Sequence, residues 1–336
     1  MKKYFYPIIA LLLVLVSLFF ATTSSIGIKY GRGNGKSKEI KSLQEFAQFC
    51  EYFNNNSNVN LQTEDGHSLF AQELFSSSSQ QEEIVSFTYH ERNVSNIKSS
   101  YQATYYNSGS IDRSSDVKIS RQLDLYVSEG KSLYHSVGQI ISSSYYCDEE
   151  GIERSGSYVD FDLWVYITNE FVAVRFLKYE IHGIEDAPDF TPTYGKWLDC
   201  GADQSILQDI NDNNMSVLGR LSKALNNEDD FKKSGKKWNI KEDNFAKCLG
   251  YVVGQTLPED LSGDFTLDLS NSSAPNVKIQ YNYSDSNSES TDYSSYSSSA
   301  SAYDSIDIVV EDINNTIIKE RIDFSNLESL SDFLED

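Results

Sequence analysis

The amino-acid sequence predicts an α+β fold that is mostly β: one large, curved antiparallel sheet (a half-barrel) with a few packed helices, behind an N-terminal hydrophobic segment. Apolar residues alternate with polar ones between about residues 67 and 200, and again after residue 263, which is the period of half-buried strands. Short stretches with three- and four-residue periodicity predict the helices. The 22 tyrosines and 18 phenylalanines suit pleated, half-exposed surfaces.

The first 25 residues have the three parts of a secretory signal. Lys2 and Lys3 precede an apolar run over residues 8–21, and a small polar exit follows at 22–25. The cleavage site imitates the small-residue pattern only loosely, so residues 1–25 are either a signal peptide or a retained signal anchor held in the membrane by residues 4–21. We therefore expect an extracytoplasmic protein, secreted or membrane-anchored, with residues 26–36 as a flexible basic spacer.

Length and charge limit the organisation and the partners. A chain of 336 residues can hold one large or two modest domains, and we predict a single extracytoplasmic domain over residues 37–336. The formal net charge of -22 repels nucleic-acid phosphates and anionic headgroups. Nucleic acid is thus not an expected partner, and membrane contact is expected only through the N-terminal segment.

The elements follow in order along the chain. Residues 37–53 read as the first helix, with Ser37 as its N-cap. Alternation predicts strands next, with a hairpin break at residues 168–170. The strands expected in this region cover residues 83–90, 101–106, 119–127, 133–141, 158–167 and 171–182.

The last third returns to strands after a helical interlude. Two helices are predicted, one ending near Leu225 and one over residues 245–252. Strands follow at 265–269, 277–283 and 306–310. The intervening segment 284–305 is rich in Ser, Asp and Tyr, and its composition predicts a mobile loop between adjacent strands.

Four cysteines allow two disulfides in an exported chain. None of them stands at zinc-ligand spacing, so a zinc site is not expected. The favoured pairing joins Cys50 to Cys248, both on predicted helices, and Cys147 to Cys200, both at strand ends. Free buried thiols are the alternative reading.

Several motifs imitate chemical sites and fail on inspection. Residues 31–37 end in Gly-Lys-Ser, but Tyr30 stands where a phosphate-binding loop needs its first glycine. Residues 209–214 begin like a calcium loop, but Arg220 stands where the loop needs a bidentate glutamate. The four histidines show no zinc or catalytic spacing, and there is no G-x-S-x-G motif. The sequence therefore predicts no catalytic residue, no metal site and no cofactor.

One family resemblance emerges in the last third of the chain. Residues 195–198 read Gly-Lys-Trp-Leu, residues 263–269 Gly-Asp-Phe-Thr-Leu-Asp-Leu, and the segments 275–279, 306–310 and 314–317 follow in order. This order resembles the extracytoplasmic lipoprotein-carrier fold typified by LolA- and LppX-like proteins and related Gram-positive envelope proteins, over residues 195–324. The resemblance implies a curved sheet around a few helices, with an apolar cavity for acyl chains. Many such proteins carry a lipid-modified cysteine, which this chain lacks.

Three functional hypotheses follow. The first is a non-enzymatic envelope protein that binds a lipid or other amphiphile, with the alternative that the same residues only fill a closed core. The candidate apolar face is Val159, Phe161, Leu163, Val165 and Ile167. The second is an exported protein–protein interaction module with Tyr158, Trp164 and Tyr166 as its contact patch. The third is a secreted hydrolase.

Overall fold

The computed structural model describes residues 30–32, 36–56, 86–105, 109–128, 131–168, 171–183, 189–200, 216–253, 257, 261–291, 294–320 and 322–333. The predicted signal or anchor at residues 1–25 and most of the predicted spacer lie outside this part of the chain. Among the helices that it does describe, none is long and apolar enough to cross a bilayer.

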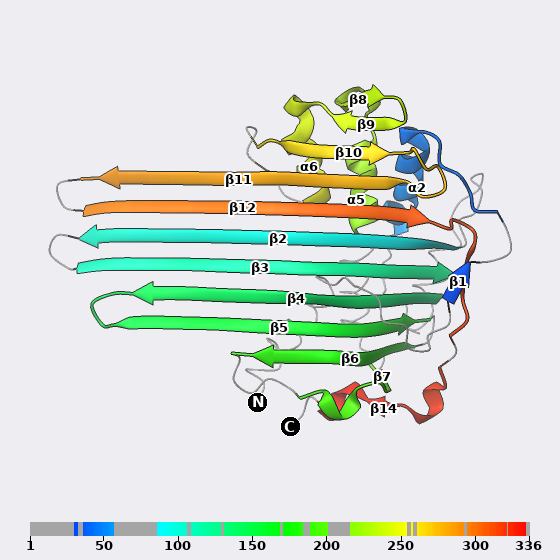
Figure 1. The fold of residues 1–336 in the computed structure, drawn as a ribbon, viewed down its shortest axis with the longest axis horizontal. Coiled ribbons are helices and arrows are strands. Elements are labelled where there is room, and N and C mark those ends of the chain that lie inside the picture. The colour runs from blue at the N-terminus through cyan, green and yellow to red at the C-terminus, as the bar shows by residue number, and fades with distance from the viewer. Residues whose placement is uncertain are drawn as a thin grey trace.

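One open sheet of twelve strands organises the molecule (Figure 1). Its strand order is β14-β7-β6-β5-β4-β3-β2-β12-β11-β10-β9-β8, antiparallel except for the parallel pair β14–β7. The predicted mostly β fold with one large, unclosed antiparallel sheet and a few helices is thus confirmed. The strands are β2 (Ser86–Tyr105), β3 (Gly109–Ser128), β4 (Lys131–Cys147), β5 (Ile152–Ile167), β6 (Val172–His182), β7 (Trp197–Asp199), β8 (Phe231–Ser234), β9 (Lys237–Ile240), β10 (Gly263–Asp268), β11 (Asn276–Ser290), β12 (Ser294–Glu311) and β14 (Glu328–Ser329).

Three α-helices in the described residues pack against one face of this sheet, which we call the inner face. They are α2 (Leu43–Asn56), α5 (Ser216–Leu225) and α6 (Phe245–Val253). Their apolar residues share one core with inner-face residues of the sheet, such as the odd-numbered residues of β5. Phe49 of α2 packs edge to face against Phe87 of β2, with the ring centres 5.7 Å apart. Helix burial of this kind supplies most of the stability of such short helices.

The opposite, outer face is covered near one end of the strands by the chain that follows β12. There β13 (Thr316–Ile318) pairs with β1 (Tyr30–Arg32), and the chain then continues to β14. A smaller apolar cluster forms beneath it. Its buried members are Tyr126, Leu133, Trp164, Tyr166 and Ile318.

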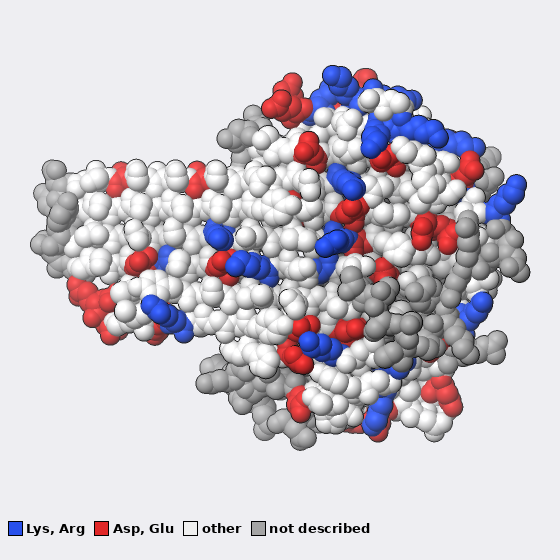
Figure 2. All heavy atoms as spheres, viewed as in Figure 1, with Lys and Arg blue, Asp and Glu red and all other residues white. Residues whose placement is uncertain are grey.

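The covered part of the sheet, with its helices, is the body of the molecule. Beyond it, six strands continue with none of the described helices on either face, and they project to the left in Figures 1 and 2. We call this projection the blade. It starts at a single register row across the sheet, and its segments are residues 283–290 of β11, 294–302 of β12, 97–105 of β2, 109–117 of β3, 142–147 of β4 and 152–157 of β5.

Two predictions about elements are wrong. Residues 284–290 and 294–305 are not a loop: they belong to the hairpin of β11 and β12, which is paired from Asn276–Val309 to Ser290–Ser295. The helix cap is not Ser37, whose hydroxyl donates to Asp312 Oδ1 at 3.1 Å. Helix α2 begins five residues later than its predicted cap would place it, and the Ser42 hydroxyl accepts the Glu45 N–H at 3.1 Å.

Candidate functional site

The blade is a single layer of sheet exposed on both faces. Its longest segments are nine residues, so it extends roughly 30 Å beyond the body. Among its described residues only Ala103, at 3 % exposed, is buried. Both of its long edges are open, because β10 pairs with β11 no further than Tyr281 and β6 pairs with β5 no further than Tyr158.

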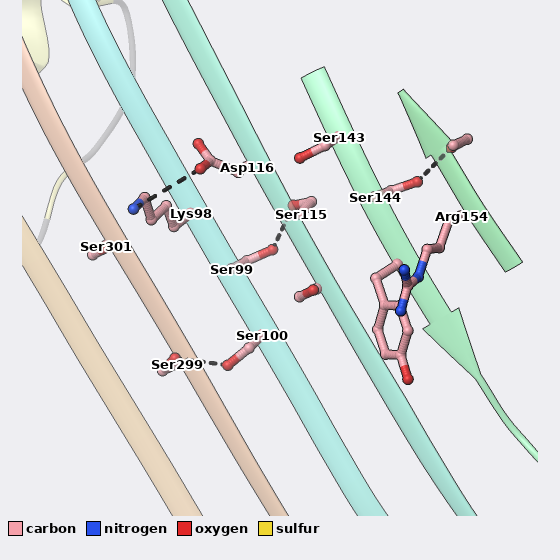
Figure 3. A pocket seen from close by; sticks show the side chains of 13 residues that line it. Lys98, Ser99, Ser100, Ser115, Asp116, Ser143, Ser144, Arg154, Ser299 and Ser301 are labelled. Carbon is pink, nitrogen blue, oxygen red and sulfur yellow. Dashed lines mark hydrogen bonds and ion pairs between the residues drawn. The ribbon is translucent and has the colours of Figure 1, made fainter. Parts of the chain in front are cut away.

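Serine hydroxyls dominate the outer face of the blade. A shallow depression of about 680 Å³ lies across β12, β2, β3, β4 and β5 (Figure 3). Strand alternation places Ser100, Ser114, Ser299 and Ser301 on this face, and the Ser100 and Ser299 hydroxyls lie 2.8 Å apart. The depression is lined by Lys98, Ser99, Ser100, Ser114, Ser115, Asp116, Ser143, Ser144, Tyr145, Arg154, Ser155, Ser299 and Ser301.

Two cations border this serine depression. Lys98 Nζ lies 3.9 Å from Asp116 Oδ2, and the Arg154 guanidinium lies 5.5 Å from the centre of the Tyr145 ring. Hydroxyls, one phenol and two cations can donate hydrogen bonds to an oxygen-rich surface. They offer no apolar enclosure for an acyl chain.

Tyrosines gather on the inner face of the blade, among serines. We call Tyr101, Tyr105, Tyr146 and Tyr296 the tyrosine patch; register places all four on the inner face. The Tyr296 hydroxyl donates to Glu289 at 2.9 Å and the Tyr146 hydroxyl to Asp148 at 2.7 Å. Both bonds raise the pKa of the phenol, because ionisation would place a second anion beside the carboxylate.

Tyr101 is held by its neighbours in the patch. A hydrogen bond with Tyr105 raises the pKa of Tyr101. These two residues flank Ala103 on the same face of β2, and Ala103 is buried. The tyrosines are thus fixed in place before any partner arrives.

A row of alternating carboxylates and imidazoles crosses the outer face of the body. His90 Nδ1 lies 2.6 Å from Asp124 Oδ1, and His90 Nε2 lies 3.2 Å from Glu311 Oε1. His135 Nε2 lies 3.0 Å from Asp162 Oδ1, and its ring stacks on Trp164 at 3.9 Å. Because both His90 nitrogens face carboxylates, that imidazole is placed to hold strands together and not to activate a hydroxyl.

The charge of His90 follows from these contacts. Burial lowers the pKa of His90, but the hydrogen bonds to Asp124 and Glu311 outweigh burial and raise the pKa to about 9. Within the part of the chain that the structure describes, no three His, Cys, Asp or Glu side chains are grouped so as to hold a metal ion.

A buried polar cluster marks the inner face where the body meets the blade. The Tyr89 hydroxyl donates to Glu91, and Arg121 Nη2 lies 3.8 Å from Glu91 Oε1. The Tyr281 hydroxyl donates to Asp304 Oδ2 at 3.3 Å. Burial raises the pKa of Glu91, and it raises the pKa of Asp304 to about 6. The apolar core therefore ends here in ionisable groups.

The five candidate ligand-face residues come together on the inner face of β5. All are buried, from 0 % exposed at Phe161 to 6 % at Val165, and all belong to the main core with the helices. In this structure they fill a packed core, which is the alternative to a ligand cavity that the sequence analysis names. The five are Val159, Phe161, Leu163, Val165 and Ile167.

The predicted disulfides do not form, and all four cysteines are free thiols. Cys147 lies beside Ile152 at the tip of the blade, whereas the Cys200 N–H donates to Val172 at the opposite end of β5. The length of a sixteen-residue strand, roughly 50 Å, separates the two, which no disulfide spans. Cys50 and Cys248 are buried on different helices, and burial raises the pKa of both thiols.

The predicted contact patch of the interaction module is misplaced. Trp164 and Tyr166 are only 5 % and 3 % exposed, because the chain after β12 covers them. Only Tyr158 stays partly exposed, and its hydroxyl donates to Asp160 at 2.6 Å. The sequence analysis did not identify the serine depression or the tyrosine patch. Ser299 and Ser301 of the depression and Tyr296 of the patch lie in the segment 284–305, whose serine-rich composition predicts a loop.

The comparisons with known proteins do not assign this chain to a family. No protein-family model matches this chain, and no curated protein matches its sequence. Its single large, curved, mostly β sheet with few helices is compatible with the half-barrel of the lipoprotein-carrier proteins. The chain is thus described by its architecture: a helix-covered body and a bare, six-stranded blade.

Proposed function

We propose that this chain is an exported, non-enzymatic protein of the cell envelope that binds another protein through its blade. The observation that carries the proposal is a serine- and tyrosine-rich sheet whose described residues are exposed or partly exposed on both faces, apart from Ala103. Serine and tyrosine are the residues that antibody binding loops favour, because tyrosine gives contact area at low entropic cost and serine gives adaptable hydrogen bonds.

The size of the blade supports the same proposal. Six strands spaced about 4.8 Å apart and roughly 30 Å long give each face an area on the order of 700 Å². A specific protein interface buries about 800 Å² per partner, so one face suffices for a standard contact. The predicted export signal places this surface outside the cytoplasm.

A blade-less variant tests the proposal directly. Residues 100–114, 145–154 and 286–299 would each be replaced by Asn-Gly, which joins Ser99 to Ser115, Ser144 to Ser155 and Asp285 to Ala300 in one register row. Both proteins would be cross-linked to intact source cells and their partners identified by mass spectrometry. We expect the full chain to capture a defined partner that the blade-less chain loses while its body stays folded by circular dichroism. Capture of the same partner by both proteins would overturn the proposal.

Lipid binding at the inner face is the second candidate. It is favoured by the compatibility with the lipoprotein-carrier half-barrel and by the apolar alternation of β5. A ligand would have to separate the helices from residues such as Phe161 and Leu163. Native mass spectrometry of the protein expressed with its own export signal, followed by organic extraction, is the test. A co-purifying lipid would favour this candidate, and a lipid-free protein that binds no apolar dye would reject it.

A further inference from the structure

The two faces of the blade differ in charge. Among its described residues, the inner face carries Asp285, Glu289 and Glu153 against one cation, Arg113. The outer face balances its two acids with two cations: Asp112 and Asp116 against Lys98 and Arg154. Because the whole chain carries -22, an approaching cationic segment is attracted generally, and the inner face adds a local excess of carboxylates.

The inner face already holds a guanidinium. Arg113 lies 4.8 Å from the centre of the Tyr146 ring, which is cation–π geometry. Tyr101 lies directly across from Arg113 in the register of β2 and β3, and the two interact electrostatically. The tyrosine patch therefore offers further ring faces of the same kind beside the acidic residues: Tyr101 lies in the register row of Arg113 and Tyr146, and Tyr296 lies two residues further toward the tip.

The patch also has the shape of an extended segment. From Glu289 on β11 to Glu153 on β5 the face crosses five strand spacings, about 24 Å. A peptide of about seven residues in extended conformation covers that length. The hydrogen bonds that fix Tyr146 and Tyr296 reduce the entropy lost when a partner binds.

We propose that the tyrosine patch binds an extended, arginine-rich segment of a partner protein, with guanidinium groups on the rings of Tyr101, Tyr146 and Tyr296 and in contact with Glu289 and Glu153. This inference rests on the proposed protein-binding function and names the face and the partner's chemistry. The serine depression on the outer face takes no part in this contact.

A labelled octapeptide of alternating Arg and Ser is the probe, with a Lys-Ser and an Asp-Ser peptide beside it. The full chain would be compared with Y101S/Y146S on the inner face and with the matched control Y145S/Y303S on the outer face. We expect fluorescence anisotropy to show about a tenfold rise in the Kd of the Arg-Ser peptide for Y101S/Y146S. The control should stay within about twofold of the unaltered chain, and circular dichroism should show all three folded.

Charge neutralisation gives a second measurement. E153Q/E289Q should weaken binding of the Arg-Ser peptide and flatten its dependence on salt, since two carboxylates no longer contribute. The Lys-Ser peptide should bind more weakly than the Arg-Ser peptide, because arginine stacks better on aromatic rings.

Two results would overturn the inference. One is equal weakening by Y101S/Y146S and Y145S/Y303S, which would mark general attraction to an acidic protein. The other is no Arg-Ser binding by the full chain. If the blade-less variant nevertheless loses its captured partner, the protein-binding function stands and only the tyrosine patch is rejected; if the blade-less variant keeps that partner, the function itself fails.

Discussion

Strand β3 runs through both the body and the blade, and its inner-face side chains are buried in the first and partly exposed in the second. In the body, Val127 is 0 % exposed under the helices; ten residues earlier on the same face of the same strand, Val117 is partly exposed in the blade. Both regions share an unbroken hydrogen-bonded ladder with β2. The ladder therefore does not depend on a buried face once a packed body anchors one end of it.

The two regions are stabilised by different interactions. The body gains from the burial of apolar side chains between the sheet and its helices. The blade has its backbone pairs and cross-strand contacts between hydroxyls, such as Ser99 with Ser115 at 2.8 Å and Ser144 with Ser155 at 2.6 Å. Changes of equal chemistry should consequently have unequal effects in the two regions.

The largest expected effect comes from a matched pair on β3. Val127→Ala should lower the free energy of unfolding by about 2–3 kcal/mol, since two buried methyl groups are replaced by a cavity. Val117→Ala should lower it by less than about 1 kcal/mol. Urea unfolding of both variants, followed by circular dichroism, measures the difference. Equal losses would mean that the blade is packed as tightly as the body.

Two glycines give the next comparison. A Cβ added at Gly138 would meet the Ser120 carbonyl oxygen at 2.6 Å and the Phe161 ring at 2.9 Å, so Gly138→Ala should cost about 1–3 kcal/mol. A Cβ added at Gly156, in the blade, meets only the Ser142 carbonyl oxygen, at 3.3 Å. Thermal unfolding should place the Gly156→Ala variant within a few degrees of the unaltered protein. A reversed order of the two melting temperatures would contradict the packing of the body.

The smallest effect concerns pH. Since the folded pKa of His90 is about 9, above its ordinary value of 6.5, its contribution is complete below about pH 6.5 and is lost as the pH rises through about 9. The His90 side chain is 34 % exposed, so solvent reduces this contribution to about 1 kcal/mol. Urea unfolding at pH 6, 8 and 10 would follow that loss.

The control for this measurement is His90→Gln. Because glutamine does not titrate, the variant should not show the fall in stability that the loss of the His90 charge causes over this pH range. Identical pH profiles for His90→Gln and the unaltered chain would show that Asp124 and Glu311 do not hold a charged imidazole.

Sequence periodicity predicts the strands of the body but only a part of the blade, residues 101–105 of β2. Residues 158–167 were predicted as a strand because one side of β5 must be apolar to meet the core. The pattern predicts two strands, over 83–90 and 101–106, but the described residues of both segments, 86–90 and 101–105, belong to one strand, β2. Where both faces are solvated, alternation of apolar and polar residues is not required, so the signal disappears while the strand continues.

The same reason explains what was missed at the candidate site. Residues 284–305 have the serine and aspartate content of a loop, and only their pairing with β2 and with each other makes them strands. Trp164 looked exposed because it alternates with core residues, but a single sequence does not show that a distant segment returns to cover it. The covering of Trp164 and the pairing of these strands both depend on contacts between residues far apart in the sequence, and local sequence patterns do not show such contacts.

Because the register of the three blade hairpins is unbroken, the length of the blade can change without changing the body. Among the described pairs of β11–β12, β2–β3 and β4–β5, residue faces residue without a shift. Adding two residues to each arm of a hairpin would extend its tip by roughly 7 Å and leave every side chain of the body on its present face. Insertions and deletions in matched pairs can thus lengthen or shorten the blade, so that natural selection can set how far the blade extends from the body independently of how stably the body folds.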